Sequence, residues 1–92
     1  MIPLSQIPKI INNGKLKTYH QSTSFLQVYY THPDLPEGSY YVFVFTTLKY
    51  ELIETKTITT QRLPIKYRAK TTGPLVMQLM RQLAHEAAEQ IT

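Results

Sequence analysis

The alternation of hydrophobic and polar residues predicts an antiparallel sheet in the middle of the chain. Segments 24–31 (SFLQVYYT) and 39–46 (SYYVFVFT) are rich in aromatic and β-branched residues, and HPDLPEG between them is rich in turn formers. Placing Tyr30 opposite Tyr40 predicts a hairpin with two apolar faces. Its even face carries Leu26, Val28, Tyr30, Tyr40, Val42 and Val44, and its odd face carries Phe25, Gln27, Tyr29, Tyr41, Phe43 and Phe45.

The next stretch of the chain predicts one long, bent strand. Residues 39–63 contain no Gly, Pro or Asn, so we expect a turn only near 54–56, after which the chain returns through TKTITTQR and LPIKYRAK. On this returning strand the buried parity changes between Ile58 and Leu63. One inserted residue causes such a change, which predicts a bulge at 61–63 beside Pro64.

The C-terminal segment from Thr72 predicts an amphipathic helix. Thr72 or Gly73 can cap it, and Pro74 suits its first turn. At about 100° per residue the apolar residues from Leu75 to Ile91 share one broad sector. We expect this helix to cover the even face of the sheet, where Val42, Val44, Leu48 and Leu52 would meet Leu75, Leu79 and Leu83.

The opening segment Leu4–Gly14 has two interpretations. Ser5 can cap a short helix that holds Pro8 in its first turn and ends at Gly14, followed by an edge strand over 15–20. Alternatively, Asn13-Gly14 is the turn of a hairpin. In either case the predicted fold class is α+β, a twisted antiparallel meander of three to four strands with one C-terminal amphipathic helix on one face, and 1–92 form a single domain.

The predicted sheet has more apolar surface than one helix can cover. A chain of 92 residues buries about two thirds of its unfolded surface, so its core is modest. Three interpretations of the uncovered odd face stay open. Ile7, Ile10 and Ile11 can fold over it; a homodimer can form through it or through the small residues Ala84, Ala87 and Ala88; or it can stack on bases. The candidate stacking or interface residues are Tyr29, Tyr41, Phe43 and Tyr67.

Positive charge is segregated along the chain. The net charge is +4, and the six carboxylates form three pairs, at 34/37, 51/54 and 86/89, so that 55–85 has none. In LPIKYRAK three cations alternate with apolar residues, about 6.6 Å apart on a strand. Such a row can follow a phosphate backbone, although cations and Pro also protect an edge strand from aggregation. The candidate anion-binding residues are Lys56, Arg62, Lys66, Arg68 and Lys70.

The residues that could carry other chemistry do not form a recognisable site. The chain has no cysteine, which excludes disulfides and thiolate chemistry. His85 and Glu89 have a metal-ligand spacing on a helix, but HEAAE lacks the second histidine of HExxH. Asp34 and Glu37 fit the turn chemistry of HPDLPEG, with Gly38 allowing a positive φ. We therefore predict no catalytic residues, no metal site, no cofactor and no enzyme activity.

Together these patterns predict a small basic binding protein. The first hypothesis is a dimeric regulatory module that contacts the phosphate backbone of DNA or RNA through its basic strand. The alternative is an adaptor, inhibitor or assembly factor that uses an aromatic sheet face or a sheet edge to bind an acidic protein partner. Because the N-terminus lacks the layout of a secretory signal and no apolar run is long enough to span a bilayer, we expect a cytoplasmic protein without a membrane segment.

Overall fold

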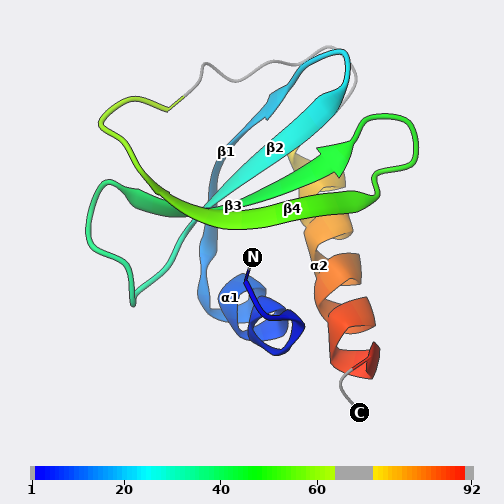
Figure 1. Ribbon diagram of the computed structural model, residues 1–92, viewed down its shortest axis with the longest axis horizontal. Helices are drawn as coiled ribbons and strands as arrows, with labels where there is room; N and C mark the ends of the chain where they lie inside the picture. Colours follow the sequence, from blue (N-terminus) through cyan, green and yellow to red (C-terminus); the bar gives the residue numbers. More distant parts are fainter. Residues whose placement is uncertain (1, 64–71, 91–92) are drawn as a thin grey trace.

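A four-stranded antiparallel sheet with two helices on one of its faces forms the fold (Figure 1). The computed structural model describes residues 2–63 and 72–90. The strands pair in chain order, which confirms the predicted α+β meander. The elements are a 3-10 turn (Leu4–Gln6), α1 (Ile7–Asn13), β1 (Lys15–Gln21), β2 (Phe25–Thr31), β3 (Ser39–Thr46), β4 (Leu52–Thr59) and α2 (Gly73–Gln90).

Local signals explain where both helices begin and where α1 ends. The helical interpretation of the opening segment is confirmed, with Pro8 in the first turn of α1 and the Gly14 N–H donating to the Ile10 carbonyl at 2.8 Å. Ser5 does not cap this helix, because it lies inside the 3-10 turn that precedes α1. At the start of α2 the predicted Thr72 cap is confirmed, since Thr72 Oγ1 accepts the Leu75 N–H at 3.3 Å.

The register between β2 and β3 differs by one residue from the prediction. Tyr30 lies opposite Tyr41, not Tyr40. The loop HPDLPEG forms two consecutive turns, closed by Leu35 N–H to His32 O at 3.0 Å and by Ser39 N–H to Pro36 O at 3.1 Å, and Gly38 adopts the expected positive φ of 85°. A shift of one residue exchanges the two faces of a strand, so the odd residues of β3 join the even residues of β2.

The chain also turns earlier than predicted. The turn between β3 and β4 covers 47–51, not 54–56, and is closed by Thr46 N–H to Glu51 O at 2.9 Å and Glu51 N–H to Thr46 Oγ1 at 3.1 Å. Tyr50 supplies the left-handed conformation (φ 52°) for which glycine is usual, so composition alone contained no turn signal. Since β4 ends at Thr59, the predicted bulge at 61–63 in a continuous strand is wrong, and a bulge lies instead at Ile53.

The main core lies between the sheet and both helices. Phe43 and Phe45 from β3 pack there with Tyr30 of β2 and with Val76 and Met80 of α2. The N-terminal isoleucines do cover these aromatic residues, as one interpretation held, but from the same side as α2 (Figure 1). Two expectations are therefore wrong. The helix does not cover Val42 and Val44, and the predicted dimer patch is occupied in the core, since Ala84 and Ala87 are buried.

The face of the sheet away from the helices carries a second, smaller cluster. Tyr29, Val42 and Val44 are buried there, and the half-buried residues Tyr40, Ile58 and Leu63 pack against them. The chain therefore reaches this face again at Leu63, four residues after the end of β4. Among the described helices, neither has the length and hydropathy needed to cross a bilayer.

Candidate functional site

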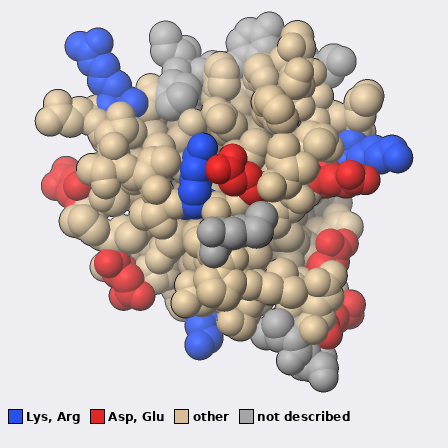
Figure 2. Space-filling model, in the orientation of Figure 1, with Lys and Arg blue, Asp and Glu red and all other residues tan. Residues whose placement is uncertain are grey.

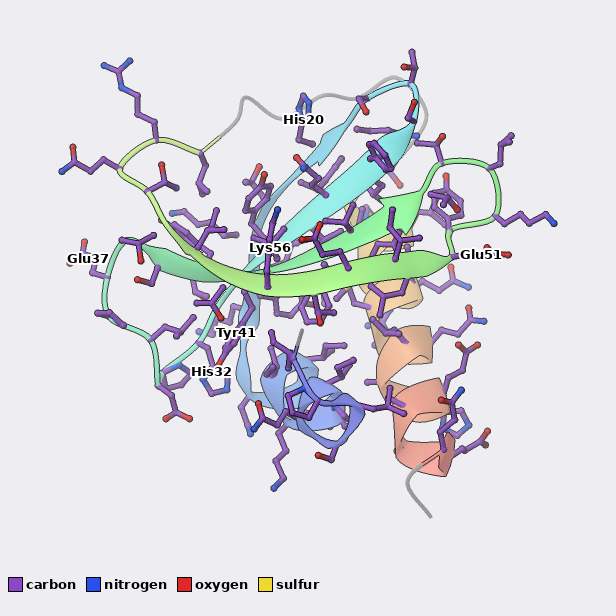
Figure 3. All side chains as sticks on the ribbon, in the orientation of Figure 1. His20, His32, Glu37, Tyr41, Glu51 and Lys56 are labelled. Atoms are coloured by element: carbon purple, nitrogen blue, oxygen red, sulfur yellow. The ribbon has the colours of Figure 1, made fainter. Side chains whose placement is uncertain are left out.

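The predicted basic residues divide into those that the structure describes and those that it does not. Lys66, Arg68 and Lys70, with Tyr67, lie outside the described residues. Lys56 points away from the helices on β4 (Figure 3), and its Nζ lies 3.7 Å from Glu54 Oε2. Alternation along the strand puts both side chains on one face. Lys56 therefore has a carboxylate neighbour just outside the carboxylate-free span, in a half-exposed pair whose contribution to stability is about 0–1 kcal/mol.

The other two described cations between residues 55 and 85, Arg62 and Arg81, do not form a row with Lys56. Arg62 follows β4. Its backbone N–H donates to Thr60 Oγ1 at 3.2 Å, and the Thr60 hydroxyl donates to the Arg62 carbonyl at 2.9 Å. Arg81 lies on α2, on the other side of the sheet. Burial raises the pKa of Tyr30, and the charge of Arg81 lowers it in part. Figure 2 shows Lys and Arg side chains separated from one another by other residues across the face drawn.

The predicted aromatic residues are less available than their hairpin pattern suggested. Phe43 is fully buried, which excludes it as a stacking surface in this structure. Tyr29 is 5% exposed, burial raises its pKa, and its hydroxyl donates to Gln27 Oε1 at 3.1 Å. Tyr41 is half-buried and contacts the ring of His32 edge-on, with centroids 5.5 Å apart (Figure 3). The predicted aromatic face is therefore divided: Phe43 and Tyr41 lie on the helix side of the sheet, and Tyr29 lies on the opposite side.

The histidines take part in local polar contacts. His32 Nδ1 accepts the Asp34 N–H at 3.1 Å, so the ring of His32, and not the Asp34 carboxylate, receives the backbone donor in this loop. His85 Nε2 and Glu89 Oε1 lie 3.0 Å apart on α2 with both side chains largely exposed. Within residues 2–63 and 72–90 no three His, Asp or Glu side chains come together as metal ligands.

A groove lies between α2 and the β3–β4 turn. Its volume is about 420 Å³, and its walls combine apolar residues with a charged rim. Tyr50, in its left-handed conformation, forms part of the wall. The rim carries one cation, Lys49, and two carboxylates, Glu51 and Glu86, so it is not an anion-binding site. The lining residues are Phe45, Lys49, Tyr50, Glu51, Leu52, Leu79, Gln82, Leu83 and Glu86.

The outer edge of β4 presents a regular row of backbone donors and acceptors. Thr60 N–H donates to the carbonyl of Gly38, the residue directly before β3, at 2.9 Å. Because backbone groups alternate direction in an antiparallel pair, those of Ile58, Lys56 and Glu54 also point toward β3. The N–H and C=O groups of the alternate residues then point outward, and no other described strand pairs with them. These residues are Thr55, which is only 2% exposed, and the exposed Thr57 and Thr59.

The two edges of the sheet differ in regularity. At the β1 edge, a bulge between Leu16 and Thr18 leaves only 18–21 paired without interruption, and Lys15 and Lys17 add charge. Bulges and lysines are common devices against strand addition. In β4 the bulge at Ile53 lies near the start of the strand, so that 54–59 pair with β3 without interruption. The β4 edge is therefore the better template for an added strand.

No protein-family model, curated protein or solved structure matches this chain. Its class consequently comes from the fold alone, a four-stranded antiparallel meander with a short N-terminal and a longer C-terminal helix packed on one face.

Proposed function

We propose that this protein is a small protein-interaction module that adds a partner strand to the β4 edge of its sheet. The observation that carries the proposal is the uninterrupted segment 54–59, in which the outward backbone groups of the exposed residues Thr57 and Thr59 lack a described strand partner. In strand addition such groups supply affinity through main-chain hydrogen bonds, while side chains on alternating faces supply specificity.

The surroundings of the edge support this choice over the other interaction surface considered from the sequence. Phe43 and Tyr41 lie on the face that α1 and α2 cover, and Tyr29 is buried in the second cluster on the opposite face. Along the edge, Thr57 and Thr59 are exposed, and small β-branched threonines allow a neighbouring strand to approach. Thr55 is buried, with its side chain on the helix side of β4. Its Oγ1 accepts the Ile2 N–H at 3.2 Å, so the N-terminal segment is bonded to β4 from that side.

Replacing Thr57 with proline is expected to abolish strand addition while the fold is retained. Proline removes an outward N–H that β3 does not use, and edge strands tolerate it at such positions. The matched control is Thr57→Val, which retains the donor and the β-branched shape. Extended peptides selected from a display library are tested against both variants by calorimetry. We expect at least a roughly tenfold loss of affinity for Thr57→Pro only, the effect of about 1.4 kcal/mol that one or two hydrogen bonds provide.

Two results would count against strand addition. One is equal peptide affinity for the Thr57→Pro variant and the wild type with both folded. The other is a set of chemical-shift changes on peptide binding that falls on α2 or β1 and not on 54–59.

A second candidate function is binding to the phosphate backbone of DNA or RNA. The net charge of +4 and the cations that follow β4 in the sequence favour it, with Arg62 in the described part and Lys66, Arg68 and Lys70 beyond it. Polyanion binding would depend steeply on salt because each neutralised phosphate releases counterions.

Charge reversal separates this candidate from the first. The double variant Arg68→Glu/Lys70→Glu is expected to weaken nucleic-acid binding at all sequences and to reduce the slope of log K against log salt by roughly 2. Its matched control, Lys9→Glu/Lys49→Glu, changes the net charge equally at exposed positions on α1 and the β3–β4 turn. Equal losses in the two double variants would indicate a net-charge effect without a site, and an unchanged slope would exclude the basic row.

A further inference from the structure

We propose that the groove beside α2 binds an amphipathic helix of a partner protein, one that carries a stripe of apolar residues with a lysine or arginine at one end of the stripe. The groove runs between α2 and the β3–β4 turn (Figure 1). Because this site is separate from the outer backbone groups of β4, it adds a second interaction surface and does not depend on strand addition.

The groove continues along α2 beyond the cavity described above. A second cavity of about 130 Å³ lies beside the first half of α2 and shares Tyr50, Leu79 and Gln82 with the first cavity. Together the two cavities follow α2 from Leu75 to Glu86, which is about 16 Å at a rise of 1.5 Å per residue. That length accommodates about three turns of a partner helix.

The residues that α2 contributes to the groove form two neighbouring ridges, each with a spacing of four residues. One ridge is apolar, and the other carries two amides and a carboxylate. In the commonest class of helix packing, a ridge of this spacing on one helix fits between two such ridges on the other. The surface therefore matches a helix whose own apolar residues are four apart. The two ridges are Leu75, Leu79 and Leu83, and Gln78, Gln82 and Glu86.

The apolar ridge is only partly covered within the protein. Leu79 and Leu83 are partly buried at the margin of the main core, and Leu75 is 39% exposed. A partner helix that removes the rest of their apolar surface from water gains free energy in proportion to that area. The face of α2 that packs on the sheet is a different set of residues, namely Val76, Met80, Ala84 and Ala87.

Charge distinguishes the two ends of the groove. The described residues that line the cavity near Leu75 carry no charge, whereas the other cavity has Glu51 and Glu86 with Lys49 on its rim. Gln82 Nε2 donates to Glu86 Oε1 at 3.0 Å, which orients this carboxylate along the rim. The excess of one negative charge favours a cationic residue at that end of the partner's stripe, although the net charge of the whole chain is +4.

Stapled helical peptides of about 16 residues, labelled for fluorescence anisotropy, test the groove. The probe peptides carry three leucines spaced by four, with two lysines at the N-terminal end of the stripe in one peptide and at the C-terminal end in the other. These two versions cover both directions in which a helix can lie in the groove. A control peptide has the same composition, with its leucines distributed around the helix.

Two pairs of variants separate the apolar ridge from the charged rim. Leu75→Gln is expected to weaken binding of a probe peptide roughly fivefold or more, whereas Leu48→Gln, which removes a 93% exposed leucine outside both cavities, leaves it unchanged. Glu86→Lys is expected to weaken binding roughly three- to tenfold. Its control, Glu37→Lys, changes the net charge equally at an exposed position in the β2–β3 loop.

Each outcome supports or overturns the inference. Support requires the expected losses in folded variants, as judged by circular dichroism, with chemical-shift changes at 75–86 and unchanged affinity in Thr57→Pro. Failure of both probe peptides to bind, equal affinity for the control peptide, or equal losses within a pair of variants would overturn it. So would a wild-type dimer that Leu75→Gln abolishes, because the groove would then hold a second copy. Chemical-shift changes confined to 54–59 would place the peptide on the β4 edge, which overturns this inference but not the proposed function.

Discussion

Replacing Phe43 with alanine is expected to lower the free energy of unfolding by about 3–5 kcal/mol, the range for a fully buried phenylalanine. Phe43 lies in the central part of β3, is fully buried and meets the ring of Tyr30 edge-on, with centroids 5.9 Å apart and planes at 81°. Truncation leaves a cavity between the sheet and both helices. Urea denaturation measures the change, and for a domain with the usual stability of about 5–15 kcal/mol the loss is large.

The matched control is Phe25→Ala on the neighbouring strand. Phe25 is 44% exposed, so its truncation is expected to cost about 1 kcal/mol. Similar losses for the two variants would contradict the assignment of Phe43 to the core. A stable Phe43→Ala protein that no longer bound its partner would return Phe43 to the interface role that the hairpin pattern first suggested.

The second large effect is expected from Gly14→Ala. A Cβ at this position would lie 2.6 Å from the backbone oxygens of Ile10 and Thr31, and neither atom can move without displacing α1 or β2. The φ of Gly14 is −93°, so the cost arises from this close approach and not from an unusual backbone conformation. Overpacking of this kind costs about 1–3 kcal/mol, and two rigid backbone contacts favour the upper end.

Gly73→Ala provides the control because a Cβ there meets no atom within 4 Å at the start of α2. This substitution is expected to be neutral or to stabilise the protein by up to about 1 kcal/mol, since alanine restricts the unfolded chain. Thermal unfolding of both variants compares them directly. A Gly14→Ala protein as stable as Gly73→Ala would show that the junction of α1 and β1 can relax.

Particular residues show how far sequence patterns predicted the candidate site. A sheet edge was one of the interaction surfaces that the sequence suggested. The limits of β4 were predicted wrongly, because Tyr50 makes the turn at 47–51 without Gly, Pro or Asn. The absence of carboxylates from 55–85 suggested an unneutralised set of cations. That pattern missed Glu54, which precedes the span by one residue and pairs with Lys56 through the two-residue period of the strand.

The sequence by itself determined the fold class, the helix at 73–90 with its Thr72 cap, and the strand segments at 25–31 and 39–46, because these depend on local periodicity and on capping between near neighbours. Only the tertiary structure decided the register of Tyr30 with Tyr41, and with it the face that α1 and α2 cover. The physical reason is that a register depends on how many residues the turns of HPDLPEG consume. A difference of one residue reverses the direction of every side chain in β3.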